Sequence, residues 1–188
     1  MLFLLETDMK IKQIHHVAYR CRDAKETVDW YVKHLKMNFI LAIAENEVPS
    51  TKAPDPYMHV FLDAGHGNVL AFFELPTQPE MDRDRNTPAW VQHFAMEVES
   101  MDELLAFKES LQAAGIEVLG PVNHTIFKSI YFFDPNGHRL ELAANIGTPE
   151  MMQKLDAVKW EMLEEWSKTR KAPKHAAWMH APQEGENA

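Results

Sequence analysis

Short apolar segments recur along the chain in a pattern that repeats once. Residues 14–21 and residues 91–98 are both part-apolar and rich in residues that favour strands, so each segment predicts a strand. When His16 is aligned with His93, the alanines two residues further on also coincide. This correspondence indicates an internal duplication.

A helical pattern follows each predicted strand, after a residue that can cap a helix N-terminus. Asp23 and Ser100 are these capping residues. The first predicted helix ends near Asn38 and the second at Gly115, because both residue types accept left-handed backbone. Apolar side chains recur at helical spacing at Val28, Tyr31, Val32 and Leu35, and at Met101, Leu104, Leu105 and Leu111.

Each repeat continues into further strands, which gives two strand–helix–strands units at residues 11–76 and 91–147. The predicted strands are 57–63 and 68–75 in the first unit, and 116–119, 128–133 and 139–143 in the second. Glycine-rich or Pro-x-Gly turns join 63 to 68 and 133 to 139. Polar, proline-rich residues predict a loop at 45–56 and a linker at 77–90.

A third section, residues 148–188, predicts a C-terminal helix followed by a tail. Thr148 is a capping residue, Pro149 suits the first helical position, and Glu150 places an acid in the first turn. We expect the apolar stripe that follows to pack on the rest of the chain or on a partner subunit, since the acidic opposite face disfavours a membrane surface. The stripe consists of Met151, Leu155, Val158, Met162 and Trp166.

Composition and charge exclude two classes of partner. The 188 residues carry a formal net charge of −9, which disfavours binding to nucleic acid or to an anionic membrane. The apolar run Met1–Leu5 is too short for a signal peptide or a membrane span, and we expect no membrane association. A single cysteine, Cys21, excludes an intrachain disulfide and favours the reducing cytoplasm.

The duplicated strands offer residues that can bind a metal. Each unit has one histidine on its first strand, His16 or His93, and one acid that leaves the apolar face of its last strand, Glu74 or Glu141. A strand histidine is usually a structural residue when it stands alone, but matching positions in both units favour a shared role. Two imidazoles and one carboxylate form a site with open positions, suited to iron(II), manganese or zinc.

With these residues and the duplicated strands, the chain resembles the vicinal oxygen chelate superfamily. That superfamily includes glyoxalase I, fosfomycin and bleomycin resistance proteins, and extradiol dioxygenases. The resemblance covers residues 11–146 and implies an α+β domain at 1–147, in which paired βαβββ modules form a curved, mostly antiparallel, barrel-like sheet around a metal cleft. It implies that His16, His93 and Glu141 bind the metal. Glu74 falls where glyoxalase I enzymes have a fourth ligand.

The second module also resembles the extradiol ring-cleavage signature. His124 is followed seven residues later by Tyr131, then by a Pro-x-Gly turn and by Glu141. The resemblance implies that Tyr131 would hydrogen-bond a catecholate oxygen and that His124 would help with proton handling. Ring-cleaving enzymes carry a further catalytic histidine where this chain has Asn68, and His66 is the nearest candidate for that role.

Three functions follow from the resemblance. The first is a metal-dependent extradiol dioxygenase that acts with iron(II) on a catecholic or related aromatic substrate. The second is a glyoxalase-like isomerase or lyase that uses Glu74 as a fourth ligand around zinc, nickel or cobalt. The third is a protein that sequesters its ligand without turnover. We expect a homodimer and an apolar pocket lined by residues such as Phe72, Met96, Phe127, Ile130 and Phe132.

Overall fold

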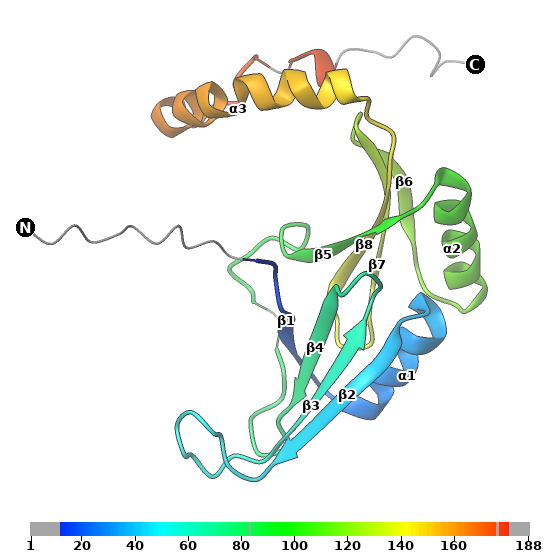
Figure 1. Ribbon diagram of the computed structural model, residues 1–188, viewed down its shortest axis with the longest axis vertical. Helices are drawn as coiled ribbons and strands as arrows, with labels where there is room; N and C mark the ends of the chain where they lie inside the picture. Colours follow the sequence, from blue (N-terminus) through cyan, green and yellow to red (C-terminus); the bar gives the residue numbers. More distant parts are fainter. Residues whose placement is uncertain (1–11, 83, 176, 181–188) are drawn as a thin grey trace, which may run out of the picture. The chain divides into compact units, whose positions relative to one another are not determined.

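The computed structural model describes residues 12–82, 84–175 and 177–180, which form two compact units. The first unit comprises residues up to 87 together with 134–138, and the second comprises 88–133 and 139 onwards. Each unit contains one helix packed on a four-stranded mixed sheet (Figure 1). This confirms the predicted α+β fold of βαβββ modules, with sheets that stay open at both edges rather than closing into a barrel.

In the first unit, the order along the chain is one strand, one helix and three strands. The elements are β1 (Val17–Cys21), α1 (Ala24–Leu35), β2 (Asn38–Glu45), β3 (Tyr57–Asp63) and β4 (Val69–Glu74). The sheet order is β1-β4-β3-β2, in which β1 and β4 are parallel and the other pairs are antiparallel. Leu62 and Phe72 are fully buried beneath α1, and the ring of Tyr31 lies 5.1 Å from that of Phe72.

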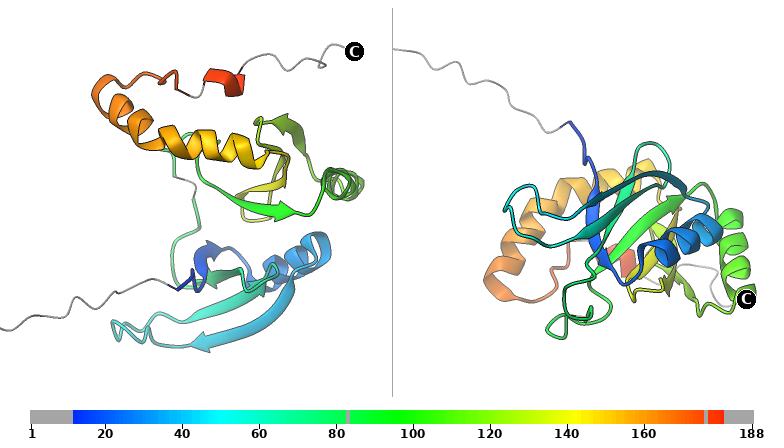
Figure 2. Two further views of the ribbon diagram at one scale, coloured as in Figure 1. Left: turned by 45° about the horizontal axis from the view of Figure 1, so that its top comes forward. Right: turned by 90° about the horizontal axis from the view of Figure 1, so that it is seen from below.

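The second unit repeats this order and adds a long helix. Its elements are β5 (His93–Val98), α2 (Met101–Ala113), β6 (Leu119–Asn123), β7 (Phe127–Phe133), β8 (Arg139–Asn145), α3 (Pro149–Thr169) and the short helix η1 (Ala177–His180). The sheet order β5-β8-β7-β6 matches that of the first unit. Ile130, Leu140 and Leu142 form the core on the side of the sheet that α2 covers (Figure 2).

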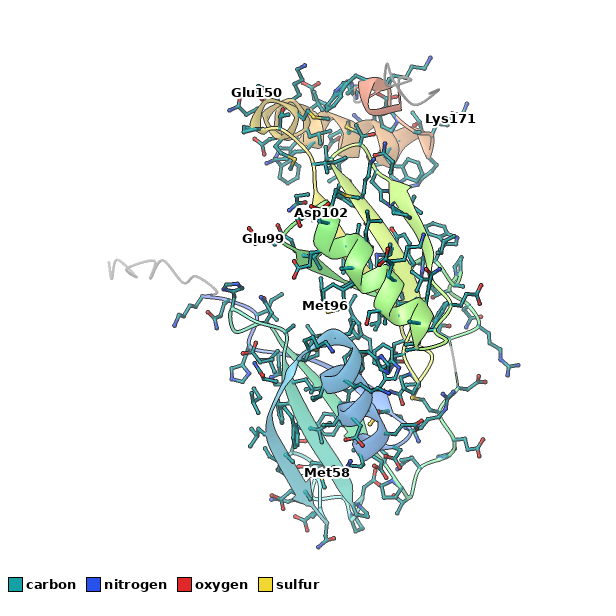
Figure 3. All side chains as sticks on the ribbon, turned by 90° about the vertical axis from the view of Figure 1, so that its right-hand side faces the viewer. Met58, Met96, Glu99, Asp102, Glu150 and Lys171 are labelled. Carbon is teal, nitrogen blue, oxygen red and sulfur yellow. The ribbon has the colours of Figure 1, made fainter. Side chains whose placement is uncertain are left out.

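The helices begin where the sequence predicts. Asp23 accepts a hydrogen bond from the backbone N–H of Glu26, and Ser100 accepts one from Glu103. Thr148 caps α3 in the same way. Acidic side chains such as Asp102 and Glu150 stand in the first turns of α2 and α3, where the helix dipole favours negative charge (Figure 3).

Two predicted boundaries were wrong. The first helix stops earlier than Asn38, because Lys36 takes the left-handed conformation that ends it. Asn38 instead begins β2, an edge strand that the hydrophobic pattern alone did not reveal. The strand predicted at 116–119 lies at 119–123, where Pro121 fits because β6 is also an edge strand.

The predicted apolar stripe of α3 is half-buried rather than buried, apart from Trp166, which is exposed. After the helix ends, the chain turns back along it, so that His175 approaches Glu165 at 3.8 Å and Lys154 lies over the ring of Trp178. Trp160 and Leu163 remain exposed. No helix within the described residues is long and apolar enough to span a membrane.

Candidate functional site

A pocket of about 460 Å³ opens on the face of the second unit's sheet that is turned away from α2. Alternation along β7 and β8 decides which side chains reach it, because neighbouring residues point to opposite faces. The lining residues are Trp90, His93, Leu119, Val122, His124, Phe127, Tyr131, Arg139 and Glu141. The pocket therefore contains four of the residues that the sequence singled out for chemistry.

Four of the five residues expected to line an apolar pocket do not line this one. Ile130 and Phe132 alternate with Tyr131 along β7 and are buried on the opposite face, under α2. Phe72 is in the same situation beneath α1, and Met96 does not line the pocket either. Phe127 alone among them lies in the pocket wall.

His93 and Glu141 form the polar centre of the pocket. Nε2 of His93 lies 2.8 Å from Oε2 of Glu141, while its Nδ1 lies 2.9 Å from the carbonyl oxygen of Val91. Glu141 is 3% exposed, and its other oxygen accepts a hydrogen bond from Ser129. A histidine held through Nδ1 by a backbone carbonyl presents Nε2 in the way that metal-binding histidines do. One imidazole and one carboxylate, aimed at each other, fit a divalent ion.

Tyr131 and His124 join this centre. Tyr131 lies directly across from Glu141 in the ladder between β7 and β8, and its hydroxyl is 2.8 Å from Nε2 of His124. Burial raises the pKa of Tyr131, and the nearby Glu141 carboxylate raises it further. The phenol is therefore held in its protonated form, able to donate a hydrogen bond.

Arg139 and Trp90 complete the pocket, and the sequence analysis did not single them out. The Arg139 guanidinium lies 4.1 Å from the centre of the Tyr131 ring, and its Nη1 donates to the carbonyl oxygen of Trp90. Arg139 shares a strand face with Glu141 because the two are two residues apart on β8. That spacing was the one signal in the sequence that could have indicated Arg139.

His16 lies in the first unit, immediately before β1. Its ring is 5.5 Å from that of Phe61 and 5.9 Å from that of His59, on the face of the sheet turned away from α1. Within the residues that the structure describes, no group of three or more His, Cys, Asp or Glu side chains is arranged to hold a metal. The meeting of His16 with His93 and Glu141 stays a prediction.

Strand register corrects the expected correspondence between Glu74 and Glu141. Glu141 is paired with Ala95, whereas the residue paired with the equivalent Ala18 is Ala71. Glu74 pairs with Cys21 at the far end of β1, about 16 Å along the strand from His16.

The Glu74 carboxylate is also engaged elsewhere, because it accepts a hydrogen bond from the backbone N–H of Ala24 at 2.7 Å. That contact lies at the beginning of α1. The ligand role of Glu74 stays a prediction, and both its hydrogen bond to Ala24 and its distance from His16 disfavour that role.

The histidine that lies beside His16 is His59, and it is buried; it is not His66, which the sequence offered as a catalytic candidate. His66 is exposed in the turn between β3 and β4 at a φ of 54°, and its catalytic role stays a prediction. His59 on β3 is 8% exposed and stacks on Phe73 with 3.6 Å between ring centres. Its Nε2 has no hydrogen-bond partner among the described residues. Burial, and secondarily His16, lowers the pKa of His59 to about 4.

Comparisons with known proteins match this chain to one family. The family model described as Glyoxalase/Bleomycin resistance protein/Dioxygenase superfamily matches residues 13–142. The uncharacterised protein YwkD of Bacillus subtilis (strain 168) is 30% identical over 138 residues, which cover 71% of this chain and 98% of YwkD.

Two further relatives are named for ring cleavage. The putative ring-cleaving dioxygenase MhqA of Bacillus subtilis (strain 168) is 29% identical over 86 residues, or 46% of this chain. Biphenyl-2,3-diol 1,2-dioxygenase 2 of Rhodococcus globerulus is 36% identical over 95 residues, also 46% of this chain. The matched regions span 27% and 50% of these two relatives.

Solved structures share the fold. A glyoxalase family protein from Enterococcus faecalis is 28% identical with a TM-score of 0.52, covering 72% of this chain and 99% of that one. The fosfomycin resistance protein FosX of Listeria monocytogenes, whose structure holds Mn(II), is 20% identical with a TM-score of 0.53, covering 77% of this chain and 100% of FosX.

Proposed function

The chain belongs to the Glyoxalase/Bleomycin resistance protein/Dioxygenase superfamily, and within it we propose that the protein is a metal-dependent, extradiol-type ring-cleaving dioxygenase. The proposed substrate is a catechol or a related aromatic with two neighbouring oxygens. One observation carries the proposal: four candidate residues line one pocket. His93 contacts Glu141, Glu141 lies opposite Tyr131, and Tyr131 contacts His124.

The proposed metal ligands are His16, His93 and Glu141. His93 and Glu141 fit this role because an imidazole nitrogen and a carboxylate oxygen already face each other. A bound divalent ion supplies positive charge that polarises the substrate oxygens and lowers their pKa. Among divalent ions we propose iron(II), since two histidines and one carboxylate with open positions are typical of iron(II) oxygenases.

Tyr131 and His124 handle the substrate's protons in this proposal. Since burial and Glu141 keep the phenol of Tyr131 protonated, it can donate a hydrogen bond to a substrate oxygen. His124 and Tyr131 exchange a proton, because Nε2 lies 2.8 Å from the hydroxyl: a protonated Nε2 donates to the phenol oxygen and leaves the phenol proton for the substrate, and an unprotonated Nε2 accepts that proton instead. The apolar side chains of Leu119, Val122 and Phe127 line the pocket and can pack against the aromatic ring of the substrate.

Relatives named for ring cleavage support this choice over a four-ligand isomerase. The position of Glu74 also favours it, since a fourth ligand would have to leave its hydrogen bond to Ala24. The experiment is anaerobic reconstitution with iron(II), followed by addition of oxygen and a panel of catechols, with the yellow ring-opened product as the readout. Absence of product with every catechol, despite one bound iron per chain, would overturn the proposal.

Two variants, with one control, separate the dioxygenase from the isomerase. Tyr131→Phe should retain iron and lose about 100-fold in turnover, whereas Tyr57→Phe, a tyrosine on β3 of the first unit, should change neither. Glu74→Gln should retain metal and ring cleavage. Loss of metal in Glu74→Gln would instead support a four-ligand, glyoxalase-like site.

We extend the proposal to a cytoplasmic homodimer. Trp160 and Leu163 on α3 are 70% and 57% exposed, which leaves apolar surface for a second subunit. Burial raises the pKa of the Cys21 thiol to about 11, so the cysteine is an inert core residue that suits a reducing compartment. A monomeric mass by light scattering would contradict the dimer.

A further inference from the structure

Arg139 presents a fixed positive charge at the wall of the pocket. Its guanidinium carbon lies over the Tyr131 ring, 4.1 Å from the ring centre, within the range of a cation–π contact. The hydrogen bond from its Nη1 to the carbonyl oxygen of Trp90, at 2.7 Å, fixes the group from a second direction. Two such contacts hold the side chain in place before any ligand binds, which lowers the entropy lost on binding.

Within the described residues, no carboxylate forms an ion pair with this guanidinium. Glu141, the one acid in the pocket wall, is already engaged by His93 and Ser129. Both partners that hold Arg139, a ring face and a backbone carbonyl, are uncharged.

We propose that Arg139 binds an anionic substituent, a carboxylate on the aromatic ring of the substrate. This proposal rests on the ring-cleaving function, which it narrows from catechols in general to catechol carboxylates. A planar guanidinium matches a carboxylate with two parallel hydrogen bonds. The apolar side chains of Leu119 and Val122 line the same pocket and can pack against the aromatic ring that carries the carboxylate.

The spacing along β8 suits such a substrate. Arg139 and Glu141 point to the same face of β8. The Cα atoms of residues two apart on a strand are separated by about 6.6 Å. A benzene ring with two neighbouring hydroxyls at one end and a carboxylate at the other spans a similar length. The hydroxyls can therefore approach Glu141 and His93 while the carboxylate approaches Arg139.

The test is a binding measurement that requires neither iron nor turnover. With EDTA present, the affinities of 3,4-dihydroxybenzoate and 3,4-dihydroxybenzamide are measured by calorimetry. The acid should bind about 10- to 100-fold more tightly than the amide, as expected for a charged hydrogen-bonded pair. Equal affinities in the unmodified protein would overturn the proposal without any variant.

Three variants complete the test. Arg139→Met should abolish the preference for the acid, and Arg139→Lys should restore part of it. The matched control, Arg85→Met, removes an exposed arginine paired with Asp82 and should retain the full preference. A preference for the acid that survives Arg139→Met in a folded protein would assign the anion to another cation and overturn the proposal.

Failure of the two proposals can be told apart. A protein that prefers the acid through Arg139 but never cleaves a catechol would retain the anion site and lose the dioxygenase function. A protein that cleaves uncharged catechols and binds acid and amide equally would retain the dioxygenase function and lose the role of Arg139.

Discussion

Replacing His59 with Phe should remove a large part of the acid sensitivity of folding. His59 is 8% exposed, stacked on Phe73, and has an Nε2 atom without a partner among the described residues. Water that would stabilise the charged imidazole is excluded, so the folded protein keeps this histidine neutral. In the unfolded chain, water surrounds the ring and it takes up a proton at its ordinary pKa.

The pKa values of His59 in the folded and the unfolded chain set the size and the sign of its contribution to stability. The pKa of His59 falls from 6.5 in the unfolded chain to about 4 in the folded one. This contribution to stability is fully present above pH 6.5 and is lost as the pH falls towards 4, because the unfolded state binds the proton first. A pKa difference of this size is worth about 3 kcal/mol in full, most of which is lost between pH 7.5 and pH 4.5.

The assay is urea denaturation of the metal-free protein at pH 7.5, 6.0 and 4.5. At pH 7.5, His59→Phe should be as stable as the unmodified protein or up to about 1 kcal/mol more stable, since it removes a buried unpaired nitrogen. At pH 4.5, the free energy of unfolding of His59→Phe should exceed that of the unmodified protein by about 2–3 kcal/mol more than at pH 7.5. The control His66→Asn, at an exposed turn position, should retain the original pH dependence. Parallel curves for His59→Phe and the unmodified protein would refute the reasoning.

Three substitutions test the packing of the units by chemical denaturation. Gly120→Ala should cost more than about 2 kcal/mol, because its Cβ would lie 2.5 Å from the carbonyl oxygen of Ser129; a loss under 0.5 kcal/mol would contradict this close approach. Tyr31→Phe should cost about 1–3 kcal/mol by removing a buried hydrogen bond to Asp134, and an unchanged midpoint would show that the bond contributes nothing. Asp23→Ala should cost about 1 kcal/mol, which Asp23→Ser should largely restore if capping is the cause.

Local patterns in the sequence predicted the elements well, because they depend on neighbouring residues. The caps at Asp23, Ser100 and Thr148 lie where polar residues precede apolar repeats. Strand β2 was not predicted because residues 39–44 are all apolar, so that no alternation of polar and apolar residues marks a strand there. Its apolar run follows the first helix without a turn sequence between them.

The pocket residues of the second unit could be predicted because they lie on neighbouring segments of the chain, whereas the strand register of the first unit could not. The spacing from His124 to Tyr131 and Glu141 was visible in the sequence and is reproduced in the pocket. The register that places Ala71, rather than Glu74, opposite Ala18 follows from long-range pairing that no local pattern reveals. His59 was missed for the same reason, since burial beside Phe73 is a property of the sheet.

The most direct test of the account is the metal affinity of single-ligand variants. Manganese(II), a redox-stable probe, should bind the unmodified protein with one ion per chain in calorimetry. His16→Ala, His93→Ala and Glu141→Gln should each weaken binding at least about 100-fold while leaving the melting temperature of the metal-free protein within a few degrees, and His175→Ala should bind normally. Unchanged manganese affinity in His16→Ala would contradict the proposal that His16, His93 and Glu141 bind one ion.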